Sequence, residues 1–137
     1  MNLTGEKVNM ELMLHVGHDK TGSSYLQSAL AKSVSLLESQ GVWYPTNNRI
    51  LKAAEGKISS GNGALFSKDF EREPNGACKK VLFSSEKFFR NFNDEDFNSQ
   101  LDLFIKRYGV RKVSLLLYIR DPIEHFSSSF QQAIKRG

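Results

Sequence analysis

The chain has 137 residues, with 19 Lys and Arg against 15 Asp and Glu, so its formal net charge is +4. Its length allows one domain, and 39% hydrophobic residues with ten Phe are enough to build a core, which excludes a disordered chain. A single cysteine, Cys78, excludes both a disulfide-stapled scaffold and a Cys-based zinc module.

The ends and charges of the chain bear on its location and partners. Residues 1–11 are polar and lack the apolar stretch of a signal peptide, so we expect them to be flexible. No apolar run is long enough to cross a bilayer, and we expect a cytoplasmic protein without a membrane span. The basic excess is small and spread along the chain, which favours small anions over nucleic acid as partners.

The first predicted unit is a strand, a turn and a helix. Residues 12–16 form an apolar run that ends at Gly17, which predicts a buried strand, and a polar turn follows. From Ser23 to about Ser39, apolar residues recur every three or four positions, which predicts an amphipathic helix. Gly41 is the expected stop of this helix.

The middle of the chain gives weaker patterns. Residues 42–44, before Pro45, predict a short second strand. Residues 46–79 are polar and rich in glycine, with a short helix near 63–70 as the candidate element. Residues 81–84 predict a third strand.

The last third of the chain predicts a helix, a strand and a second helix. Asp94, Glu95 and Asp96 suit the positive N-terminal end of a helix, and Gly109 ends it. Residues 113–119 predict a buried strand, and Pro122 stands where the first turn of the final helix tolerates it.

Strands that alternate with helices require crossover connections. We therefore predict an α/β fold, a single domain over residues 1–137 with a mostly parallel sheet flanked by helices in three layers. Because the final helix runs to Gly137 without a closing strand, we expect the chain to be the N-terminal part of a longer enzyme, with the fold incomplete at the C-terminus.

The turn after the first predicted strand has the composition of an anion-binding loop. A helix N-terminus there offers free backbone N–H groups and partial positive charge, and Gly22 allows a phosphate to approach closely. Thr21, Ser23 and Ser24 add hydroxyl donors, and Lys20 adds a full charge. The alternative is an ordinary strand-to-helix turn that happens to be rich in Gly and Ser.

A nucleotide-binding Walker A loop has the pattern GxxxxGK[ST], and Gly17 and Gly22 match its glycine spacing. However, Ser23 stands at the lysine position, and Lys20 lies two residues before the second glycine. The order Lys-Thr-Gly-Ser-Ser after a strand resembles instead the 5′-phosphosulfate loop of sulfotransferases, enzymes that use 3′-phosphoadenosine 5′-phosphosulfate (PAPS). Asp19 departs from the proline that is usual in this family.

A second segment supports the same resemblance. The strand predicted at 113–119 delivers Arg120 to its carboxyl end, where it should face the same crevice as Lys20. Arg120, Asp121 and Pro122, with Ser128 eight residues after the arginine, resemble the 3′-phosphate motif of the family. The alternative is that Arg120 pairs with a neighbouring carboxylate at the strand end.

Glu86 is the candidate general base. It follows the third predicted strand, and a glutamate before a lysine at this place is similar to the base position of the carbohydrate sulfotransferases. The alternative is a solvated charge or a helix cap beside Lys87. His15, inside a predicted strand, is expected to be a packed core residue. No residues have metal-ligand spacing, so we predict no metal.

The resemblance implies a PAPS-dependent sulfotransferase with a P-loop-like fold. It assigns Lys20 and Glu86 to catalysis and seven residues to donor binding, namely Lys20, Thr21, Gly22, Ser23, Ser24, Arg120 and Ser128. It implies PAPS as the donor, 3′-phosphoadenosine 5′-phosphate (PAP) as the product, and a small-molecule or carbohydrate acceptor with a hydroxyl or amine. The alternatives are a P-loop kinase-like enzyme and a non-catalytic fragment that binds PAP. The acceptor and the oligomeric state stay open.

Overall fold

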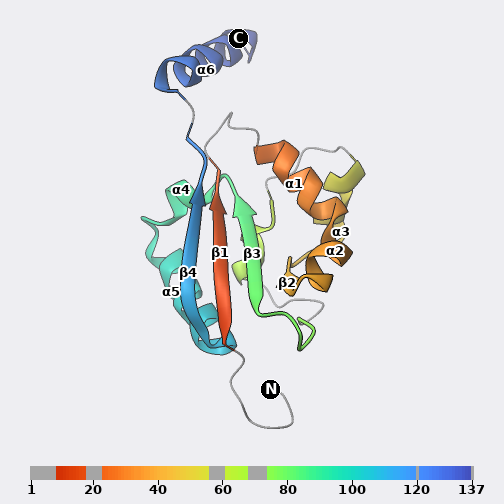
Figure 1. Cartoon of the computed structure of the whole chain (residues 1–137). Coiled ribbons are helices and arrows are strands. Elements are labelled where there is room, and N and C mark those ends of the chain that lie inside the picture. The colour runs from red at the N-terminus through yellow and green to blue at the C-terminus, as the bar shows by residue number, and fades with distance from the viewer. Residues whose placement is uncertain (1–8, 18–22, 56–60, 68–73, 120, 137) are drawn as a thin grey trace.

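The structure is a computed structural model, and it describes residues 9–17, 23–55, 61–67, 74–119 and 121–136 (Figure 1). Four strands are found there: β1 (Met10–Val16), β2 (Val42–Trp43), β3 (Lys80–Ser85) and β4 (Val110–Leu117). The helices are α1 (Ser23–Lys32), α2 (Val34–Ser39), α3 (Asn48–Leu51), α4 (Phe88–Asn91), α5 (Glu95–Tyr108) and α6 (Pro122–Arg136), with two 3-10 helices, η1 (Lys52–Glu55) and η2 (Gly63–Ser67).

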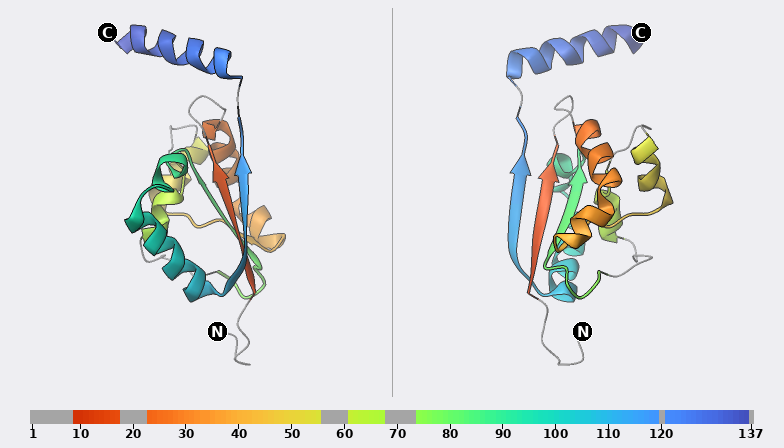
Figure 2. Two further views of the ribbon diagram at one scale, coloured as in Figure 1. Left: turned by 90° about the vertical axis from the view of Figure 1, so that its left-hand side faces the viewer. Right: turned by 45° about the vertical axis from the view of Figure 1, so that its right-hand side comes forward.

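The strands form one sheet in the order β2-β3-β1-β4, and each neighbouring pair is parallel. Crossover helices are therefore required, and they flank the sheet, with α1, α2 and α3 at the β2–β3 end and α4 and α5 on the β4 side (Figures 1 and 2). The predicted α/β fold with a parallel sheet is confirmed.

The core lies between the sheet and α5. Alternate residues of the central strands point to this side, and Leu12, Leu14 and Phe83 are fully buried. Phe66 of η2 stacks on Phe83 with ring centroids 4.1 Å apart, and Phe104 of α5 meets Phe66 edge-on at 5.1 Å. These aromatic contacts between η2, β3 and α5 hold the helical layer against the sheet.

The termini of α5 show why local sequence predicted this helix well. The Asp94 carboxylate accepts hydrogen bonds from the backbone N–H groups of Asp96 and Phe97, the geometry of an N-cap. Gly109 ends the helix with a left-handed φ of 60°. Both signals were present in the sequence, and both ends of the predicted helix are confirmed.

Several element boundaries differ from the prediction. Met10 and Glu11 already belong to β1, although we expected residues 1–11 to be flexible. The helix predicted from Ser23 to Ser39 is two helices, because the Ser33 N–H bonds to the Leu30 carbonyl three residues back and breaks the α-helical pattern.

The strand predicted at 113–119 is β4, which lies at 110–117, and its predicted burial is wrong. β4 is an edge strand, and Leu115 is 62% exposed. The following helix, α6, extends beyond the sheet rather than along it (Figures 1 and 2). Its apolar side chains are also exposed, with Ile123 at 81% and Phe126 at 72%. The apolar run and the apolar stripe correctly indicated a strand and a helix, but they carried no information about what covers these elements.

Candidate functional site

The carboxyl ends of the three long strands meet in one row. Val16 of β1 is in register with Ser85 of β3 on one side and with Leu117 of β4 on the other. The backbone N–H of Gly17 donates to the Ser85 carbonyl at 3.4 Å, which continues the pairing past the last row. In open parallel sheets this edge is where ligands bind, so it is the candidate functional site.

Each predicted motif follows one of these three strand ends. Lys20 comes four residues after Val16, Glu86 comes directly after Ser85, and Arg120 comes three residues after Leu117. Because β1 is the central strand of the three, its carboxyl end lies between those of β3 and β4. The topology therefore starts all three segments from the same edge of the sheet.

Only some of the predicted site residues lie within the part of the chain that the structure describes. Four lie outside the described residues, namely Lys20, Thr21, Gly22 and Arg120. Two belong to helices while their side chains lie outside the description, namely Ser23 in α1 and Ser128 in α6. The side chains of Ser24 and Glu86 are described.

Helix α1 begins beside the carboxyl ends of β1 and β3 (Figures 1 and 2). It has ten residues, and its first turn carries Ser24, which is exposed. The free N–H groups and partial positive charge of such a helix end favour an anion. The strand-to-helix unit predicted from sequence is therefore present, with Ser24 on its solvent side.

Glu86 lies in the short connection between β3 and α4 and is half-buried. The N–H of Lys87 donates to the Ser85 hydroxyl at 3.2 Å, which folds the chain into a tight turn around Glu86. Lys87 itself occupies the N-cap position of α4 and makes no side-chain cap there. Glu86 therefore lies directly after β3, at the same edge of the sheet as the end of β1.

One row below this edge, a buried histidine joins two strands. His15 Nδ1 lies 2.8 Å from the Ser84 hydroxyl, and the Tyr118 ring lies 5.1 Å from the imidazole. His15 is 1% exposed, so its predicted burial is confirmed. Burial lowers its pKa below the ordinary value of 6.5, because desolvation disfavours the charged imidazolium, and the ring is neutral at pH 7.

Asn62 pairs with β3 on the side that faces away from β1, and the sequence analysis did not single it out. It is fully buried, its N–H donates to the Ser84 carbonyl, and its Oδ1 accepts from the Ser84 N–H at 2.7 Å. Its Nδ2 donates to the carbonyls of Leu82 and Pro45. Asn62 therefore supplies the hydrogen bonds of a neighbouring strand where β2 has already ended.

A glycine beside Asn62 makes this arrangement possible. Gly61 has a φ of +80°, and a Cβ added there would lie 1.9 Å from the Ser84 carbonyl oxygen. Only glycine fits both the left-handed backbone and this close approach. The signal in the sequence was the Gly-Asn-Gly run at 61–63, inside a segment to which periodicity assigned no clear role.

The described residues include no group of three or more His, Cys, Asp or Glu side chains that could hold a metal ion. Within the same ranges, no helix has the length and apolarity needed to cross a membrane. Comparison with protein families, with curated proteins and with solved structures finds no match to this chain.

Proposed function

We propose that this chain is the nucleotide-binding part of a PAPS-dependent sulfotransferase. The observation that carries the proposal is the shared row of Val16, Ser85 and Leu117. A segment that resembles a sulfotransferase motif follows each of these strand ends. Three segments that lie far apart in the sequence thus start from one edge, as a single donor site requires.

In this proposal the 5′ end of the donor binds between β1 and α1. Thr21, Gly22, Ser23 and Ser24 provide backbone N–H groups and hydroxyls around the 5′-phosphosulfate. The start of α1 beside the ends of β1 and β3 supports this role, because the helix directs its partial positive charge to that edge (Figure 1). Lys20 would balance the charge of the departing phosphate.

The 3′ end of the donor binds on the β4 side. Arg120 can hold a phosphate with two parallel hydrogen bonds, and Ser128 adds a hydroxyl from α6. β4 is the direct neighbour of β1, so the two segments to which we assign the phosphates follow adjacent strands. A donor that carries phosphates on both sides of its ribose can therefore contact both segments.

The transfer step follows from these positions. The acceptor oxygen forms a bond to sulfur while the bond between sulfur and the 5′-phosphate oxygen breaks, which releases PAP. Glu86, on the β3 side, takes the proton of the acceptor hydroxyl, and Lys20 stabilises the negative charge that develops on PAP. Catalysis then depends chiefly on positioning and charge stabilisation, as in phosphoryl transfer.

One observation favours a second candidate, a chain that binds PAP without transferring sulfate. α6, which carries Ser128, extends away from the sheet (Figure 2). Ser128 therefore lies on a helix that extends beyond the strand ends. A P-loop kinase-like function is the third candidate, and the place of Lys20 before Gly22 in the sequence counts against it.

Calorimetric titration with PAP and with ATP plus Mg²⁺ tests the proposal. We expect PAP to bind with a Kd on the order of micromolar and ATP to bind more weakly. Lys20→Ala should weaken PAP binding at least about tenfold. Lys32→Ala, which removes an exposed lysine from the far end of α1, is the matched control and should leave it unchanged. Preference for ATP, or equal PAP binding by Lys20→Ala, would contradict the proposal.

A further inference from the structure

Two buried side chains near the carboxyl ends of β1 and β3 have polar atoms without hydrogen-bond partners among the described residues. His15 and Gln27 are each 1% exposed. In the part of the chain that the structure describes, His15 Nε2 and both amide atoms of Gln27 have no hydrogen-bond partner. Buried polar groups in folded proteins are nearly always paired, so these three atoms require an explanation.

The two side chains lie around the same residue, Ser84. His15 Nδ1 lies 2.8 Å from its hydroxyl. Gln27 Nε2 lies 2.9 Å from the position of a Cβ on Gly61, and that position is 1.9 Å from the Ser84 carbonyl oxygen. His15 and Gln27 therefore approach the end of β3 from β1 and from α1, two residues before Glu86.

The geometry of His15 is that of an oriented functional group. The bond to Ser84 fixes the ring through Nδ1 and leaves Nε2 as the free end, an arrangement also found in histidines that serve catalytic sites. Burial keeps the imidazole neutral, so Nε2 can form a hydrogen bond without a charge. A purely structural residue would be expected to use both ends, as Asn62 does with its Oδ1 and Nδ2.

Unpartnered buried polar atoms destabilise the folded state, because they lose their hydration and gain nothing in return. Natural proteins keep such violations chiefly at functional sites, where a ligand or a second state supplies the missing bonds. The proposed donor site begins one row above His15 and at the first turn of α1, one turn before Gln27.

We propose that His15 and Gln27 are positioning residues for the donor site, and that their free atoms form hydrogen bonds in the ligand-bound form. In that form they hold the ends of β1 and β3 and the start of α1 in the geometry that binds PAP. This inference rests on the proposed function, and PAP is the probe that tests it.

The decisive variant is Gln27→Met, which removes two unpartnered atoms, keeps the volume, and breaks no hydrogen bond among the described residues. We expect its Tm to equal or exceed that of the wild type and its PAP affinity to fall at least about tenfold. A purely structural role predicts a lower Tm instead. Thermal unfolding and PAP calorimetry on the full chain provide both readouts.

Two substitutions distinguish the role of His15 Nδ1 from that of its Nε2. His15→Gln can imitate Nε2 and His15→Asn can imitate Nδ1, since the amide groups lie at matching distances from the backbone. We expect His15→Gln to retain PAP affinity within about threefold and His15→Asn to lose about tenfold or more. The reverse order would show that the bond to Ser84 alone matters, and it would overturn the proposed role of Nε2.

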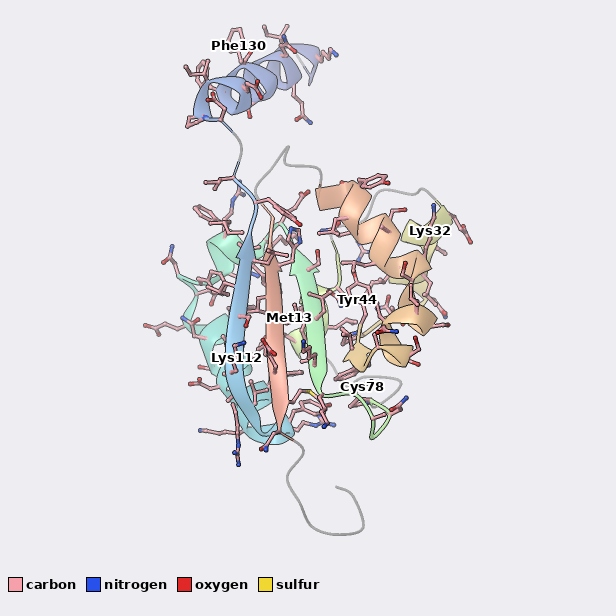
Figure 3. The ribbon with its side chains drawn as sticks, viewed as in Figure 1. Met13, Lys32, Tyr44, Cys78, Lys112 and Phe130 are labelled. Atoms are coloured by element: carbon pink, nitrogen blue, oxygen red, sulfur yellow. The ribbon has the colours of Figure 1, made fainter. Side chains whose placement is uncertain are left out.

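Two control residues calibrate the readouts. Tyr44 also has a buried polar atom without a partner among the described residues, and it lies beside the middle of β3, away from the edge (Figure 3). Tyr44→Phe should therefore keep or raise the Tm and leave PAP affinity unchanged. Asn62→Leu removes a polar side chain with all its partners present and should lower the Tm.

The outcomes distinguish this inference from the proposed function. If the wild type fails to bind PAP, the proposed function fails and the inference falls with it. If the wild type binds PAP and Gln27→Met binds it equally well, the inference alone is overturned. Loss of PAP binding together with a lower Tm would assign Gln27 a structural role and would also overturn it.

Discussion

His15 Nδ1 and the Ser84 hydroxyl lie 2.8 Å apart, a buried hydrogen bond that joins β1 to β3 one row below their carboxyl ends. The partners are 69 residues apart in the chain. The strand of His15 leads into the loop with Lys20, and the strand of Ser84 leads into Glu86. This one bond therefore connects the two segments to which we assign the donor phosphate and the base.

Burial of His15 makes the stability of the protein dependent on pH. Its pKa is lower in the folded state than in the unfolded chain, so the unfolded state binds more protons as the pH falls below the ordinary value of 6.5. The contribution of neutral His15 to the free energy of unfolding is therefore fully present above this value, and it decreases as the pH falls toward the lowered pKa. The decrease is limited to about 1.4 kcal/mol per pH unit.

Urea unfolding at about pH 7.5 and about pH 5.5 measures this dependence. We expect the wild type to lose more stability over this interval than His15→Gln, which has no imidazole to protonate. Equal losses in the two proteins would show that other groups account for the acid sensitivity.

Gly61 should be the least replaceable glycine among those with a described left-handed backbone. In Gly61→Ala the new Cβ would meet the Ser84 carbonyl oxygen at 1.9 Å, so the edge of β3 must move. We expect a loss of about 3 kcal/mol in the free energy of unfolding. Gly41→Ala is the matched control, since its φ of +75° is similar and its nearest atom is 3.5 Å away.

For Gly41→Ala we expect a loss of about 1 kcal/mol, the contribution of the left-handed backbone alone. Denaturant unfolding of both variants gives the difference between them, which isolates the steric contacts of a Cβ at position 61 with Ser84 and Gln27. Equal losses at Gly61 and Gly41 would contradict the close approach described for Gly61.

Glu86→Gln tests the proposed base without disturbing the donor. We expect PAP affinity to stay within about twofold of the wild type and PAP release from PAPS, with a panel of hydroxyl acceptors, to fall at least about a hundredfold. Glu95→Gln, an exposed glutamate at the start of α5, is the control and should keep its rate. A Glu86→Gln variant with most of its transfer rate would remove Glu86 from the mechanism.

The exposed apolar side chains of β4 and α6 should cause self-association. On α6, Phe126 is 72% exposed and Phe130 is 58% exposed, and their rings stack on one side of the helix. We expect concentration-dependent association in light scattering that decreases in Phe126→Asp. Leu103→Asp removes a 66% exposed apolar residue from α5 and is the control. A wild type that stays monomeric at high concentration would contradict this expectation.

Local chemistry determined the elements of this protein. The capping carboxylate of Asp94, the stop at Gly109, and the apolar periods of the strands and helices act between residues a few positions apart, so they can be recognised in the sequence. The parallel sheet followed from the alternation of strands and helices. The succession of β1 and α1 was predictable for the same reason.

Tertiary structure decided the neighbours of each element. Three features depend on contacts between segments that are distant in the chain. They are the hydrogen bond of His15 to Ser84, the hydrogen bonds of Asn62 along β3, and the burial of Gln27. The exposure of β4 was equally invisible in its apolar pattern. Periodicity reports which face of an element is apolar, but burial and hydrogen bonding depend on what packs against that face, and only the fold determines this.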